Sequence, residues 1–258
     1  MVTALTMLAP PAIEQADAPG YQRPESLPIN AALDRIAATR VNSLETTLQT
    51  LKYLGDRRFE IGREELDLTE PAWLELCRLA GLPTDLLERL RRHLGDIVFR
   101  CIANDDDPRG AQRIRVVHAA KKALALTSRE LTCLSNEAVV GAIRDAWPAE
   151  ISSETVSVTD FRLTEAEFEL SCHTDRLAAE PRKGDILHGG VTIRHSQAGL
   201  MPTVVLSYVY RLVCANGLTQ RVCLGGKPAR TKRCKADNSA QQMLDALQNQ
   251  VTQAFRQL

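Results

Sequence analysis

The hydrophobic residues of this 258-residue chain change their spacing near Ile151, and this change limits the folds that the chain can adopt. Before that point they mostly recur at helical intervals, whereas after it apolar and polar residues alternate, as in strands that bury one face. The stretch SVTDFRLTEAEFELSCHTD reads as two strands around a turn near Thr164. VTIRHSQAG predicts a further strand, and PTVVLSYVYRLVCANGLTQRVCLGG predicts a long strand with a return strand. Because short turns join antiparallel strands, the second part of the chain predicts a mostly antiparallel sheet.

The last predicted element is an amphipathic helix in NSAQQMLDALQNQVTQAFRQL. Such a helix must bury its apolar face, so we expect it to pack on the sheet or on another subunit. The predicted fold class is therefore α+β, with an N-terminal helical region, a mostly antiparallel sheet and this C-terminal helix. We divide the chain into a flexible, proline-containing arm (1–28), a helical-rich region (29–150) and the sheet with its basic loop and final helix (151–258). The apolar face comprises Ala240, Met243, Leu244, Leu247, Val251, Phe255 and Leu258.

The helical-rich region opens with VNSLETTLQTLKYLG, in which apolar residues from Val41 to Leu51 recur at helical spacing and Gly55 is a stop signal. The clearest helical pair follows in LTEPAWLELCRLAGLPTDLLERLRRHLGD. Thr69 is its expected N-cap, Gly81 breaks it, and Gly95 is expected to end the second helix. This layout fits a DNA-reading helix-turn-helix or a plain αα-hairpin.

Three further elements complete this region. DIVFRCIAN reads as a strand, and RIRVVHAAKKALALTSRELTCLS as a strand, a turn and a second ordered segment. NEAVVGAIRDAWP predicts a helix that Asn136 caps and Pro148 ends.

The composition is typical of a soluble globular protein, with 44% hydrophobic and 25% charged residues. No apolar run reaches the roughly 18 residues of a membrane span, and no Lys or Arg precedes Arg23, which argues against a secretory signal. Seven cysteines, an odd number with wide spacing, indicate reduced thiols in a cytoplasm. We therefore expect a cytoplasmic protein without a membrane partner.

Motifs for metal, nucleotide and nucleophile chemistry are weak. Cysteine pairs at zinc-ligand spacing are absent, the DDDPRG turn lacks calcium-loop spacing, and the Gly189-Gly190 and Gly225-Gly226 pairs belong to no phosphate-binding motif. Cys172 and His173 are adjacent, so on a strand they point to opposite faces and cannot activate each other. Cys214 with His188 or His195 stays open as a Cys/His pair. We expect no catalytic residue, metal or cofactor.

Charge is distributed unevenly along a chain whose formal net charge is zero. Between Ile186 and Ala236 there is no Asp or Glu, so the span is strongly basic. Such clusters supply salt-dependent affinity for nucleic acid, and the alternative is a solvated loop that pairs with acidic surface elsewhere in the protein. Tyr208 and Tyr210 would stack on bases or are ordinary strand residues. The candidate nucleic-acid-binding residues are Arg211, Arg221, Lys227, Arg230, Lys232, Arg233 and Lys235.

The stretches GDILHGGVTIRHSQAG and YRLVCANGL resemble the phage/plasmid-like proteins grouped as domain of unknown function 932. LTEPAWLELCRLAGLP and RIRVVHAAKKALALTSRELTCLSNEAVVGAI are similar to two further regions of that family, so the resemblance covers roughly residues 68–226. The sequence departs from the family where Ser128 is followed by Arg129 rather than by an aromatic residue. The resemblance implies a mobile element and DNA metabolism, and it carries over no catalytic residue. The matching residues are Gly184, Asp185, Gly199, Arg211, Cys214, Asn216 and Gly217.

Asn216-Gly217 also has a purely structural explanation, because this pair favours a type I′ hairpin turn. The β-β-β-α order of the second part resembles the core of phage single-strand annealing proteins, an analogy of architecture. Our leading hypothesis is a non-enzymatic nucleic-acid-binding protein of a phage or plasmid-type mobile element that binds or anneals single-stranded DNA as a homo-oligomer. The alternatives are an assembly protein that docks through its C-terminal helix and, with least support, a Cys/His-dependent enzyme.

Overall fold

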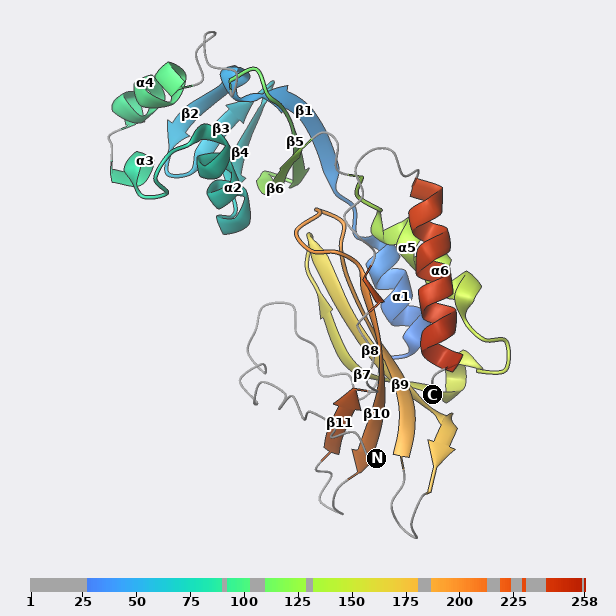
Figure 1. Ribbon diagram of the computed structural model, residues 1–258. Coiled ribbons are helices and arrows are strands. Elements are labelled where there is room, and N and C mark those ends of the chain that lie inside the picture. The colour runs from blue at the N-terminus through green and yellow to red at the C-terminus, as the bar shows by residue number, and fades with distance from the viewer. Residues whose placement is uncertain are drawn as a thin grey trace, which may run out of the picture.

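The computed structural model describes residues 27–89, 92–102, 110–128, 132–180, 187–212, 219–223, 229–230, 240–256 and 258 (Figure 1). Within these residues, helices combine with two sheets whose strand pairs are antiparallel with one exception, and a helix closes the chain. The predicted α+β class is confirmed. The predicted limits at 28/29 and 150/151 stay predictions.

The first lobe contains strands β1–β6 and helices α2–α4. Its sheet has the order β1-β5-β6-β4-β3-β2, in which the β4–β6 pair is parallel. Helix α2 packs on β6 and helix α4 packs on β2, so both helices cover the sheet. The strands are β1 (Asn42–Thr47), β2 (Leu51–Gly55), β3 (Arg58–Ile61), β4 (Glu64–Leu68), β5 (Arg113–Ala119) and β6 (Lys122–Ser128). The helices are α2 (Glu70–Ala80), α3 (Leu86–Arg89) and α4 (Arg92–Ile102).

The aromatic core of this lobe is centred on Phe59, which is buried completely. The Phe59 ring lies 5.1 Å from that of Tyr53, 6.5 Å from that of Trp73 and 5.2 Å from that of Phe99, measured between centroids. Burial of large side chains from strands and helices holds the two layers together.

The second lobe contains the antiparallel sheet β7-β8-β9-β10-β11, with β12 also paired to β10. Helices α1, α5 and α6 lie side by side on one face of this sheet (Figure 1). Its strands are β7 (Val156–Leu163), β8 (Glu167–Ala179), β9 (Leu187–Ser196), β10 (Val204–Leu212), β11 (Thr219–Cys223) and β12 (Ala229–Arg230). Its helices are α1 (Ile29–Ala38), α5 (Asn136–Ala146) and α6 (Ala240–Arg256), and a 3₁₀ turn, η2, spans Ser153–Thr155. The strands predicted after Ile151 thus occur in the predicted order, within an antiparallel sheet.

The C-terminal helix α6 packs on α5 and β10 of its own chain. Met243, Leu247, Val251 and Phe255 are buried, and the Phe255 ring lies 4.9 Å from that of Trp147. Most of the apolar face that the sequence identified is therefore covered within the chain, whereas Ala240 at the start of the helix is exposed.

Two segments have a different type of secondary structure from the one predicted. Residues 42–55, expected to be helical, form β1, the 3₁₀ turn η1 (Leu48–Thr50) and β2, because Leu51 and Tyr53 alternate with exposed Lys52 and bury one face. The segment expected to be a strand, DIVFRCIAN, lies largely in helix α4, whose Phe99 enters the aromatic core.

Helix ends follow the sequence more closely. Thr69 is the N-cap of α2, and Gly81 ends it at φ 68°, in the left-handed region that favours glycine. The N-cap of α5 is Ser135, one residue before the predicted Asn136, because its hydroxyl accepts a hydrogen bond from the backbone N–H of Ala138. Gly95 does not end a helix, since α4 continues past it.

The helix-turn-helix hypothesis gains no support, because α2 and α4 each pack on the sheet through different strands, β6 and β2. The two lobes meet through a cluster of apolar residues. Val117 and Ala119 of β5, with Leu124 and Ala125 of β6, form one cluster with Ala198 from the β9–β10 turn.

Candidate nucleic-acid interface

The described residues of the acid-free span form strands β9, β10, β11 and β12, which neighbour one another in the second sheet and carry its described arginines. We call β10, β11 and β12 the basic edge. Arg211 lies opposite Gln220 of β11, and Arg221 lies opposite Tyr210 of β10. Arg230 of β12 lies opposite Val204. Four candidates, Lys227, Lys232, Arg233 and Lys235, lie outside the described residues.

One row of paired positions joins Arg194 of β9, Val204 of β10 and Arg230 of β12. Neighbouring strands are about 4.8 Å apart, so the backbones of Arg194 and Arg230 are about 10 Å apart across the sheet. Arg194 belongs to the acid-free span, but the sequence did not place it among the candidates. The alignment of Arg194 with Arg230 becomes apparent only from the register of the strands.

Arg194 forms an ion pair with Glu169 of β8, with a nitrogen-to-oxygen distance of 2.7 Å. The Arg194 side chain is 46% exposed, so the pair is near the surface and contributes little to stability. It does neutralise one cation of the row.

Tyr208 is an anchor of the sheet rather than a stacking surface. Its side chain is 1% exposed, and its hydroxyl donates a hydrogen bond of 3.0 Å to the backbone carbonyl of Cys172. Because that donation uses the only hydroxyl proton, the 3.1 Å contact with Thr159 has the threonine hydroxyl as donor. The hypothesis that Tyr208 stacks on a base is therefore wrong, since neither ring face is accessible. Tyr210 has a described backbone, opposite His188 and Arg221.

The Gly189-Gly190 pair is explained by packing. A Cβ on Gly190 would lie 2.5 Å from Tyr208 Cζ and 2.6 Å from the Cys172 carbonyl oxygen. A Cβ on Gly189 would lie 3.0 Å from Cβ atoms of both Leu177 and Leu258. The pair therefore lets chain segments approach closely in the middle of a sheet.

His195 is a structural residue. Its Nδ1 lies 2.8 Å from the Thr203 hydroxyl and its Nε2 lies 3.0 Å from the carbonyl oxygen of Leu134. The carbonyl can only accept, so Nε2 carries the proton and Nδ1 accepts from Thr203. Burial lowers the pKa of His195 to about 4, and the hydrogen bond to Leu134 opposes this shift only in part. The imidazole is neutral at physiological pH.

The other cysteines and histidines considered for a Cys/His nucleophile pair form few contacts of that kind within the described residues. Cys172 is buried, with Sγ 3.8 Å from the carbonyl oxygen of Val191. His173 and His188 lie on adjacent strands with ring centroids 5.3 Å apart, a contact created by strand pairing that the sequence did not reveal. Cys214 lies outside the described residues, so its pairing with a histidine stays a prediction.

Within the residues that the structure describes, no three His, Cys, Asp or Glu side chains gather to hold a metal ion. No helix of the described part of the chain is long and apolar enough to cross a membrane. No protein-family model, curated protein or solved structure matches the chain.

Proposed function

We propose that the protein binds single-stranded nucleic acid through the basic edge and does not catalyse a reaction on it. The observation that carries the proposal is that the described parts of a 51-residue span without Asp or Glu form neighbouring strands, with Arg194 and Arg230 in one row. Arginines on neighbouring strands gather positive charge at one part of the sheet, and their positive potential attracts a polyanion.

The proposed preference for single-stranded over double-stranded nucleic acid is supported by one observation, the order of elements in the second lobe. Strands β7–β11 followed by α6 on one face fit the β-β-β-α order that resembles phage annealing proteins. The origin in a phage or plasmid-type mobile element rests on the resemblance to the domain of unknown function 932 family. Homo-oligomerisation belongs to the same proposal. Because most of the apolar face of α6 is covered within the chain, association would use another surface.

The test is fluorescence anisotropy with labelled single- and double-stranded DNA of one sequence at about 50 mM salt, where phosphate contacts are strong. We expect tighter binding of the single strand and a clear loss in the variant R211A/R221A/R230A. The matched control, R58A/R63A/R89A, removes the same charge from exposed positions of the first lobe. Absence of binding by the wild-type protein, or an equal loss in the control, would overturn the proposal. A native mass measurement that finds only monomer would overturn the homo-oligomer.

A further inference from the structure

The first lobe contains a polar cleft where the two edges of its sheet approach each other. Strands β1 and β2 are the outermost strands, yet only the three residues of η1 connect them. In a flat sheet, five inter-strand gaps of about 4.8 Å would hold those edges roughly 24 Å apart. The sheet must therefore curl, and the cleft lies at this corner.

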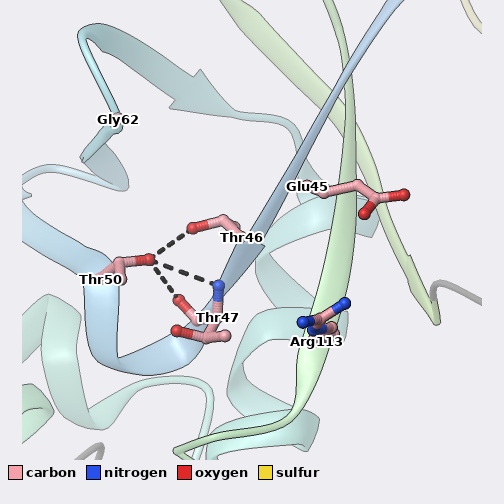
Figure 2. A pocket seen from close by; sticks show the side chains of 6 residues that line it. All are labelled: Glu45, Thr46, Thr47, Thr50, Gly62 and Arg113. Atoms are coloured by element: carbon pink, nitrogen blue, oxygen red, sulfur yellow. Dashed lines mark hydrogen bonds between the residues drawn. The ribbon is translucent and has the colours of Figure 1, made fainter.

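The cleft, which we call the Thr/Arg cleft, has a volume of about 690 Å³. Figure 2 shows its lining, in which Arg113 extends beside Thr47 while Thr46 and Thr50 face each other across the turn. The lining residues are Glu45, Thr46, Thr47, Thr50, Gly62 and Arg113. The volume falls within the range of roughly 300–1,000 Å³ that is typical of small-molecule sites.

A hydrogen-bond network fixes the threonine corner. The Thr50 hydroxyl donates to the Thr47 carbonyl at 2.9 Å and accepts from the Thr47 backbone N–H at 3.4 Å. Since that proton is used, the Thr46 hydroxyl is the donor in its hydrogen bond with Thr50. The corner is held in place before any ligand arrives, which lowers the entropic cost of binding.

Arg113 is the cation of the cleft that has no acidic partner. Its side chain is exposed, and its guanidinium forms no hydrogen bond or ion pair within the described residues. Its neighbour along the strand, Arg115, lies opposite Glu45 with a nitrogen-to-oxygen distance of 3.9 Å. Arg115, which is not part of the lining, therefore engages Glu45, whereas no carboxylate of the described residues pairs with Arg113.

We propose that the Thr/Arg cleft binds the phosphate group of a small phosphorylated molecule of mononucleotide size. The planar guanidinium of Arg113 presents paired N–H donors that match phosphate oxygens, and the adjacent Thr47 hydroxyl adds a further group that can donate. This site belongs to the first lobe and does not depend on the basic edge, so it stands apart from the proposed function.

Amide shifts in ¹⁵N-labelled protein, titrated with adenosine 5′-monophosphate, inorganic phosphate or adenosine, test the proposal. We expect the two phosphate-bearing probes to shift the amides of Thr46, Thr47, Thr50 and Gly62, and adenosine to leave them unchanged. R113Q should weaken the binding of adenosine 5′-monophosphate by about ten-fold or more, the effect of losing a charge-assisted contact. R58Q alters another exposed arginine of the same sheet, one that forms no ion pair with any residue the structure describes, and it should have no effect.

A second variant gives a change in the opposite direction. E45Q removes the carboxylate that offsets Arg115, so it should tighten phosphate binding. Shifts confined to other amides, a response to adenosine equal to that for its monophosphate, or unchanged affinity in both R113Q and E45Q would overturn the proposal. R211A/R221A/R230A should leave these shifts intact, so failure of the cleft and failure of the basic edge are distinguishable.

Discussion

The phenol of Tyr208 lies over Gly190, and its hydroxyl donates a 3.0 Å hydrogen bond to the backbone carbonyl of Cys172. Three strands of the second sheet, β8, β9 and β10, are joined by this one side chain in addition to their backbone ladders. The contact needs a residue without a Cβ at position 190, which is why a glycine stands within a central strand.

Gly190→Ala should therefore destabilise the protein by about 1–3 kcal/mol, the usual effect of overpacking. The added methyl would meet a ring carbon at 2.5 Å and a backbone oxygen at 2.6 Å, and the backbone oxygen cannot rotate away. Urea unfolding measures the change. Gly189→Ala is the control, because its contacts begin at 3.0 Å and need shifts of only a few tenths of an ångström, so it should destabilise less. A larger loss in Gly189→Ala than in Gly190→Ala would contradict this explanation.

Two glycines within eleven-residue helices should respond in opposite directions to alanine. Gly141 of α5 has open space where a Cβ would lie, so Gly141→Ala should stabilise the fold by roughly 0.5–1 kcal/mol through helix propensity. A Cβ on Gly95 of α4 would lie 2.5 Å from Tyr53 Cε1, so Gly95→Ala should destabilise it. Thermal and urea unfolding of both variants measure these effects. Stabilisation by Gly95→Ala would show that the Tyr53 ring can move aside.

The sequence predicted that Gly95 ends a helix, but Gly95 lies inside α4. This difference shows why the sequence predicts the second lobe better than the first. Alternation in β7–β10 has one explanation, a strand with one buried face, and the structure confirms it. In the first lobe, Leu44, Leu48 and Leu51 fit helical spacing equally well, and only the curling of the sheet makes this segment two strands. Gly95 reads as a stop signal because a ring packed against it is invisible in the sequence.

The two candidate sites also differ in how much of each could be predicted from the sequence. A run of residues without Asp or Glu can be read directly from the sequence, so the arginines of the basic edge could be selected without a structure. The alignment of Arg194 with Arg230 depends on the register of three strands. Arg113 and Thr47 come together only because β1 pairs with β5 across distant parts of the chain. No local pattern contains that information.

His195 should make stability depend on pH below neutrality. Its pKa is about 4 when folded and 6.5 in the reference state, so between these values the unfolded chain binds more protons. The contribution of the neutral, buried ring is fully present above pH 6.5 and is lost as the pH falls toward 4. The shift corresponds to about 3 kcal/mol. Urea unfolding at several pH values from 4 to 8 should show a flatter profile for His195→Gln, and parallel profiles for variant and wild type would contradict the assignment.

Glu169→Gln should strengthen nucleic-acid binding, because it releases Arg194 from its ion pair and adds one free cation to the row shared with Arg230. For single strands, each extra phosphate contact steepens the dependence of log affinity on log salt by about 0.7. Anisotropy titrations with single-stranded DNA from roughly 50 to 200 mM salt measure this slope. Glu65→Gln, an equal charge change at an exposed position of the first sheet, should leave the slope unchanged. An identical slope in Glu169→Gln and wild type would place Arg194 outside the contact surface.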